Sequence, residues 1–139
     1  MASTHYEIVG RELHPRLIWN HIIIRVLRVV RLPKTRCSEE INSIECIIHD
    51  VEKTFLHMHI PKLFVQKWLE KPKEGGAYQI HRFLVVYNSY RNKTTTHRYM
   101  LQFCERTIIG VLKDADFPTH IYDRDDYDFS EEVLVVDRQ

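Results

Sequence analysis

The sequence has few of the features that mark membrane, secreted or disulfide-stabilised proteins. Arg25 and Arg28 interrupt its longest apolar run, so no apolar segment reaches the ~18–20 residues that span a bilayer. Residues 1–15 contain no apolar stretch of the kind found in signal peptides. The three cysteines are too sparse, and odd in number, for a disulfide framework, which makes a reducing compartment the default. We therefore expect a soluble intracellular protein with no membrane partner.

The sequence also lacks the motifs of common catalytic and metal sites. The glycine pair in EGGAY is not followed by Lys-Ser or Lys-Thr, so it predicts a turn rather than a phosphate-binding loop. His57 and His59, with His49, would place three imidazoles on one sheet face, but no Cys-x-x-Cys or His-x-x-x-His spacing accompanies them. Cys46 and Cys104 both fall within strand alternation, and Cys46 belongs to the core-facing set, where a small apolar thiol is the simplest role. We expect no catalytic residue, no metal and no cofactor.

The composition suits a single hydrophobic core, and the charged residues are distributed unevenly along the chain. With 139 residues, 44% apolar and 28% charged, the chain suits a single globular domain with a short extension at each end. Residues 1–113 contain 18 basic and 10 acidic residues, a balance of +8, whereas residues 114–139 contain 2 and 9, a balance of −7. The basic body favours a polyanion-binding surface. The acidic end is either an arm beside that surface or a solvated linker.

Alternation of apolar and polar residues predicts five strands. They cover residues 22–32, 42–50, 54–60, 77–87 and 96–106. In the second and third strands, one face should enter the core, and it consists of Ile44, Cys46, Ile48, Leu56, Met58 and Ile60. The opposite face consists of Glu45, Ile47, His49, Phe55, His57 and His59.

The rhythm changes at residues 61–71, which predict a short amphipathic helix. Pro61 suits a first helical turn, and Leu63, Phe64 and Trp68 would share one side, with Trp68 capping the core. Three strands, a helix and two strands match the OB-fold, a five-stranded, partly open Greek-key barrel of the all-β class. Its binding groove lies over strands two and three, between the one-to-two and four-to-five loops. An SH3-like barrel would share the strands, but the helix argues against it.

The predicted organisation has three parts. Residues 1–21 form an N-terminal arm that packs on the barrel, and residues 22–113 form the OB-fold domain. Residues 114–139 form the acidic C-terminal extension or linker, in which Tyr122, Tyr127 and Phe129 alternate with carboxylates. One hypothesis is that this extension imitates a nucleic-acid strand and competes for the groove. The alternative is a linker toward a following domain.

Several segments, in order and spacing, resemble the first DNA-binding OB domain of the replication protein A large subunit. They are IIIRVLRVVRLPKT, IECIIHD, FLHMHIPKLFVQKW, EGGAYQIHRFLVVYNSYR and THRYMLQF. The likeness is strongest to the plant and Helitron-transposon-associated relatives, and it covers residues 12–113. It implies single-stranded DNA binding without catalysis in DNA replication, repair or recombination. It also implies a nuclear location and other replication protein A-like subunits as partners.

Binding a single strand requires cations along the backbone and flat side chains on which bases stack. The two loops predicted to flank the groove contain both. The candidate residues there are Lys34 and Arg36 in the first loop, and Tyr87, Tyr90, Arg91, Lys93 and Arg98 in or beside the second. By the resemblance, Tyr90 is the nearest match to a base-stacking aromatic of the family. Its alternative role is a hairpin tyrosine on the edge of the barrel.

The sequence departs from the family at three positions. After strand three the family has a second stacking aromatic, but this chain reads His59-Ile60-Pro61-Lys62. His57 and His59 would face outward there, either as imidazole stacking surfaces or as solvated side chains. The turn Asp50-Val51-Glu52-Lys53 lacks the glycine usual in the family, and Val30 replaces an aromatic near the end of strand one.

Two other functions remain open at this stage. The groove of an OB-fold can bind protein, so an adaptor or assembly subunit is the main alternative, which the missing aromatic and the acidic end favour. RNA is equally compatible with stacking surfaces that tolerate either sugar.

Overall fold

The computed structural model describes residues 7–16, 21–37, 39–90, 95–113 and 117. These residues form one curled sheet and two 3-10 turns, η1 (Gly10–Glu12) and η2 (Lys62–Phe64). The strands are β1 (Glu7–Ile8), β2 (His21–Pro33), β3 (Ile41–Asp50), β4 (Phe55–Pro61), β5 (Ala77–His81), β6 (Leu84–Tyr87), β7 (Tyr99–Gln102) and β8 (Ile108–Leu112). Within the described ranges, no helical segment has the length and hydropathy of a membrane span.

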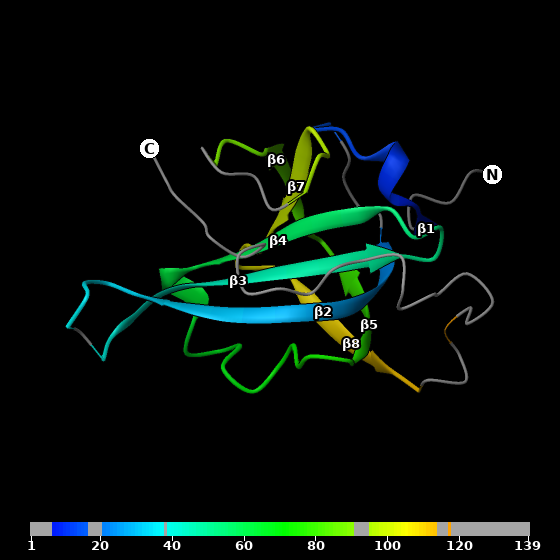
Figure 1. The fold of residues 1–139 in the computed structure, drawn as a ribbon. Helices are drawn as coiled ribbons and strands as arrows, with labels where there is room; N and C mark the ends of the chain where they lie inside the picture. Colours follow the sequence, from blue (N-terminus) through cyan, green and yellow to red (C-terminus); the bar gives the residue numbers. More distant parts are fainter. Residues whose placement is uncertain (1–6, 17–20, 38, 91–94, 114–116, 118–139) are drawn as a thin grey trace.

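The long strand β2 holds the sheet together. It pairs antiparallel with β3 along most of its length, and its first five residues also pair with β5. The strand order is β6-β7-β4-β3-β2-β5-β8, with β1 parallel to the start of β2 (Figure 1). A bulge at Leu27, where the β2–β3 register shifts, lets β2 bend from one part of the sheet to the other. The result is a curled, mixed sheet, which confirms the predicted all-β OB-fold.

The core lies on the concave side of this sheet and contains the predicted face of β3 and β4. Ile44, Cys46, Ile48, Leu56, Met58 and Ile60 are each at most 1% exposed. Trp68 packs on this core with its ring edge-to-face against Phe103, as expected for a capping residue. Burial also raises the pKa of the Cys46 thiol well above its usual range. Cys46 is therefore a protonated core side chain, in agreement with its predicted role.

The segment predicted to be a helix contains only one 3-10 turn. After η2, the Trp68 amide donates to the carbonyl oxygens of Phe64 and Val65, and the chain continues as turns. Leu63 was expected on the packed side but is 83% exposed, while Val65 is buried. A segment this short gains little from helical hydrogen bonds alone, so packing of Val65 and Trp68 decides its conformation. The turn still occupies the predicted position between the third and fourth strands of the barrel.

The predicted fourth strand divides in two, and the predicted fifth strand is shorter than expected. Residues 77–87 form β5 and β6, separated where Arg82 adopts a left-handed φ of 58° and Phe83 is buried. Of residues 96–106, only Tyr99–Gln102 form a strand, and β8 begins beyond the predicted end. The Arg82 carbonyl accepts a hydrogen bond from Thr107 Oγ1 at 3.0 Å, which fixes the chain direction before β8. This break allows β5 to pair with β8 while β6 pairs with β7.

Asp50 organises the turn in which a glycine was missing. Its Oδ1 accepts hydrogen bonds from the amides of Glu52 and Thr54, and its Oδ2 accepts one from the Gly10 amide at 2.5 Å. Lys53 adopts the left-handed conformation, with φ at 61°, that glycine adopts without strain. The turn is thus tight, and the N-terminal segment is tied to it through Gly10.

The backbone of Lys53 gives a prediction about stability. Lys53→Gly should raise the free energy of unfolding by about 1 kcal/mol, because a side chain in the left-handed region costs roughly 1–2 kcal/mol. Gly75→Ala is the matched control, since Gly75 has φ at 84° with no atom within 4 Å of an added Cβ. It should destabilise by a similar amount. Urea unfolding followed by circular dichroism measures both, and a destabilised Lys53→Gly would contradict the prediction.

Candidate nucleic-acid interface

A buried carboxylate organises the outer face of β3 and β4. Glu45 on β3 lies directly opposite His59 on β4. Its Oε1 accepts hydrogen bonds from His57 Nε2 and Tyr90 Oη, each at 2.6 Å. Its Oε2 accepts from His59 Nδ1 at 2.7 Å and from Ser43 Oγ at 2.5 Å. Four donors therefore fill the lone pairs of the two carboxylate oxygens, and we call these five residues the Glu45 cluster.

The Glu45 cluster is closed to solvent. All five side chains are buried, and the Tyr90 ring lies over the His57 ring with centroids 4.7 Å apart. Burial alone would raise the pKa of Glu45, but the hydrogen bonds from His57 and His59 outweigh burial and lower this pKa to about 2. Glu45 is thus ionised at neutral pH. The cluster fastens Tyr90, at the start of the four-to-five loop, to the middle of the sheet.

These contacts correct the predicted environment of three candidate residues. His57 and His59 lie on the predicted face of β4, but they are neither exposed stacking surfaces nor solvated, because their ring nitrogens bind Glu45. Tyr90 is likewise buried and packs its ring inward. The alternation rule identifies the face of a side chain but not what covers it. A single carboxylate within the apolar strand INSIECIIH, opposite two histidines, was the available signal.

An exposed aromatic residue, Tyr87, lies instead on the β6–β7 hairpin beside the half-buried Tyr99 and His97. Tyr87 is 63% exposed and pairs across the strands with Tyr99, with ring centroids 5.2 Å apart. His97 lies 6.2 Å beyond Tyr99, and its Nε2 donates to the Gly10 carbonyl while its Nδ1 accepts from the Tyr99 amide. Tyr87, Tyr99 and His97 form what we call the aromatic row. Arg98, also exposed, lies in the same hairpin.

Of the aromatic row, only Tyr87 is among the residues predicted from the sequence to bind nucleic acid. Tyr99 lies within the predicted strand 96–106, and the signal for its role is its position opposite Tyr87 once the hairpin register is known. Arg91 and Lys93, two of the predicted cations, lie outside the described residues.

The one-to-two loop presents cations whose charge is partly neutralised. Lys34 and Arg36 are both exposed, as predicted. Glu40 lies 3.8 Å from Lys34 Nζ and 2.7 Å from the Nζ of Lys62. The hydrogen bond and positive charge of Lys62, followed by the charge of Lys34, lower the pKa of Glu40. Lys62 therefore extends this basic site, and Lys34, Arg36 and Lys62 against Glu39 and Glu40 give a net charge of +1.

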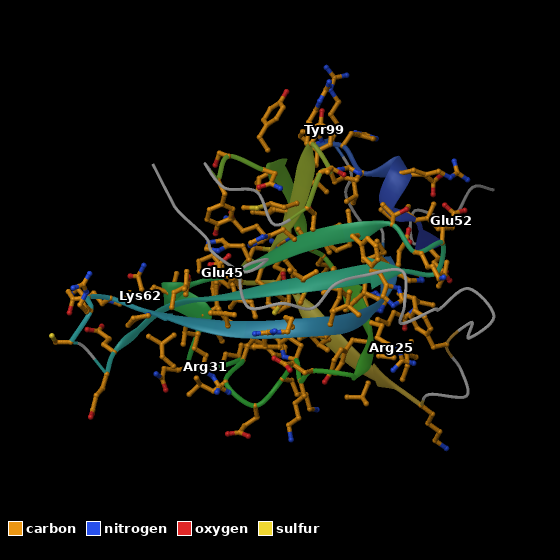
Figure 2. All side chains as sticks on the ribbon, in the orientation of Figure 1. Arg25, Arg31, Glu45, Glu52, Lys62 and Tyr99 are labelled. Atoms are coloured by element: carbon orange, nitrogen blue, oxygen red, sulfur yellow. The ribbon has the colours of Figure 1, made fainter. Side chains whose placement is uncertain are left out.

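The two groups of exposed residues lie on either side of the Glu45 cluster. Figure 2 shows Lys62 at one end of the sheet, Tyr99 on the raised β6–β7 hairpin, and Glu45 between them. In this view, the surface between the two groups is therefore the packed Glu45 cluster rather than an open one.

The first part of the acidic segment also contacts the outer face. Phe117 is 2% exposed, with the Arg25 guanidinium 4.8 Å from its ring centroid and the His49 ring at 5.6 Å. Phe55 packs edge-on against the other side of His49. Burial lowers the pKa of His49, and the hydrogen bond between its Nδ1 and the Asp50 carbonyl only partly offsets this effect. His49 is therefore neutral at pH 7.

The described residues contain no group of three or more His, Cys, Asp or Glu side chains arranged for a metal ion. The described surface presents the exposed Tyr87 with the half-buried Tyr99 on one hairpin, cations on the two loops and a ring contact at Phe117.

The curled sheet, with its loops flanking one face, defines an OB-fold domain. The family described as Domain of unknown function DUF223 matches residues 11–129, and the chain belongs to this family. Among solved structures it is similar to a chain of a replication protein A heterotrimer bound to single-stranded DNA, with 17% identity and a TM-score of 0.59. That match covers 78% of this chain and 25% of the other.

A hypothetical protein of Arabidopsis thaliana, solved in solution, is also similar, with 15% identity and a TM-score of 0.50. That match covers 79% of this chain and 75% of the other. A comparison with curated protein sequences gave no match. At these identities the structural matches establish the shared fold. The chain spans about a quarter of the length of the replication protein A chain that it resembles.

Proposed function

We propose that this chain binds single-stranded DNA through the aromatic row and the cations of the flanking loops. The observation that carries the proposal is the exposed Tyr87, paired with Tyr99, on an OB-fold hairpin that also contains the exposed Arg98. Rings of this kind accept unstacked bases, and the neighbouring cation can contact the phosphate between them. The shared fold with a protein bound to single-stranded DNA supports the proposal.

The finer parts of the proposal follow from the family resemblance. We propose that the protein acts without catalysis in DNA replication, repair or recombination, in the nucleus and in a plant. Other replication protein A-like subunits are the expected partners. RNA can occupy the same rings, so oligo-U is the comparison ligand for oligo-dT.

A salt titration of fluorescein-labelled oligo-dT, followed by anisotropy, tests the proposal. We expect binding that weakens as salt rises, because phosphate contacts release counterions. Arg98→Ala should weaken binding and reduce the slope of log K against log salt by ~0.7, the value for one phosphate contact to a single strand. Glu105→Ala, at another exposed charge, is the control and should not reduce the slope. The absence of binding at low salt would refute the proposal.

A protein-binding adaptor is the second candidate function. Two observations favour it: the packed surface over the Glu45 cluster, and the exposed apolar side chains Ile108 and Val111 on β8. An adaptor would show no salt-dependent binding of either oligonucleotide, so the same titration separates the two functions.

A further inference from the structure

Phe117 binds the face of the sheet that is turned away from the core. It is nearly fully buried, yet it is not part of the core cluster formed by the inner faces of the strands. Its partners Arg25 and His49 lie opposite each other on β2 and β3. They belong to the same outer face as the Glu45 cluster, two of whose members, Glu45 and His57, lie further along β3 and β4.

The side chains around Phe117 are suited to a flat ring. Arg25 lies over the ring face, and its Nη1 is held by a hydrogen bond of 2.6 Å to the Gly75 carbonyl. His49 meets the ring at an angle of 80°, and it is itself fixed between Phe55 and the Asp50 carbonyl. We call Arg25, His49 and Phe55 the ring slot. A guanidinium over a ring face and an aromatic edge beside it are contacts that nucleobases also make.

We propose that the ring slot is a base-binding subsite that Phe117 fills in the free protein, so that the C-terminal segment inhibits nucleic-acid binding in cis. This inference rests on the proposed function and adds a second point of contact, distinct from the aromatic row. A nucleotide in the slot would bring a phosphate toward Arg25, whereas Phe117 brings no charge of its own.

The short connection between β8 and Phe117, and the opposite charges of the two segments, favour competition between Phe117 and a nucleobase. Phe117 follows the end of β8 at Leu112 by five residues, so its effective concentration at the slot is high. Residues 114–139 have a charge balance of −7 against +8 for residues 1–113, which attracts the segment to the basic domain. A nucleic-acid strand that binds at the ring slot must therefore displace Phe117, which competes for the slot from within the same chain.

The test compares oligo-dT affinity at low salt for the wild type, Phe117→Ala and Phe117→Tyr. Phe117→Ala should bind about 5-fold more tightly or better, because removal of the competitor raises the fraction of protein with an empty slot. Phe117→Tyr keeps a ring and should bind like the wild type. Val111→Ala, which shortens an apolar side chain that is 61% exposed on β8, is the matched control and should change nothing.

NMR of the His49 ring protons provides a readout that does not depend on affinity. In the free protein, Phe117→Ala should shift these protons by removing a ring current, and saturating oligo-dT should also shift the wild-type protons, because a base then replaces the phenyl ring beside His49. Unchanged His49 shifts in Phe117→Ala would overturn the slot. If the wild type binds oligo-dT and Phe117→Ala binds it with the same affinity, the proposed competition is wrong, while the proposed function stands. If none of the proteins binds oligo-dT, the proposed function fails and the inference fails with it.

Discussion

Glu45→Ala is expected to lower the free energy of unfolding by roughly 3–5 kcal/mol, the usual cost of removing one partner from a buried charged network. The substitution removes the buried carboxylate that accepts hydrogen bonds from His57, His59, Tyr90 and Ser43. The melting temperature should fall by on the order of 10 °C or more. Thermal and urea unfolding followed by circular dichroism measure both changes.

The pH dependence of stability distinguishes this network from ordinary packing. The pKa of Glu45 is lowered to about 2 in the folded protein from its ordinary value of 4.5. Its contribution is therefore fully present above pH 4.5 and is lost as pH falls toward 2. The wild type should lose roughly 3 kcal/mol over this range through Glu45 alone. Glu45→Gln should lack this component and show a flatter profile.

Ser43→Ala is the graded control for the network. It removes one of the four donors to Glu45 without removing the charge, so the cost should be about 1 kcal/mol. Equal effects of Ser43→Ala and Glu45→Ala, or parallel pH profiles of wild type and Glu45→Gln, would show that the carboxylate does not stabilise this face.

Tyr87→Ala is expected to weaken oligo-dT binding by about 5- to 30-fold, which corresponds to ~1–2 kcal/mol for one lost base stack. Stability should change little, because the Tyr87 side chain is largely exposed and lies near the end of β6. Fluorescence anisotropy at fixed low salt measures the change in affinity. The effect should be similar for oligo-dT and oligo-U, since stacking does not depend on the sugar.

Tyr87→Phe is the control for the ring itself. It retains the stacking surface and loses only the hydroxyl, so its affinity should stay close to that of the wild type. If Tyr87→Ala and Tyr99→Ala both bind within twofold of the wild type, the aromatic row is not part of the interface.

The sequence was most informative where the environment of a side chain depends only on its position within its own strand. Alternation in β3 and β4 correctly predicted the core face from Ile44 to Ile60, because successive side chains of a strand point to opposite faces, although the structure buries the other face as well. The two loops that were predicted to flank a groove were identified from the order of the strands alone. Lys34, Arg36, Tyr87 and Arg98 are exposed there, as a binding role requires, although their contacts with a ligand stay predictions.

The failures have a common physical cause, which is contact between residues distant in sequence. Tyr90 reaches Glu45 across 45 positions, and this contact buries side chains that alternation alone would leave in solvent. Phe117 reaches His49 and Arg25 from a segment with no strand pattern. β8 was missed for the same reason, since its five residues include Gly110 and are recognisable as a strand through their pairing with β5.

The strand order also bears on how the chain matures during synthesis. β2, β3 and β4 pair with their neighbours in sequence, so this three-stranded meander can assemble once residue 61 has left the ribosome. Its inner face, however, stays uncovered until β5 pairs with β2 and β7 pairs with β4. Of these two strands, β7 is synthesised last, about forty residues after the end of β4. The nascent chain therefore presents a row of isoleucines without a cover, and we expect it to require protection from self-association until residue 102 emerges.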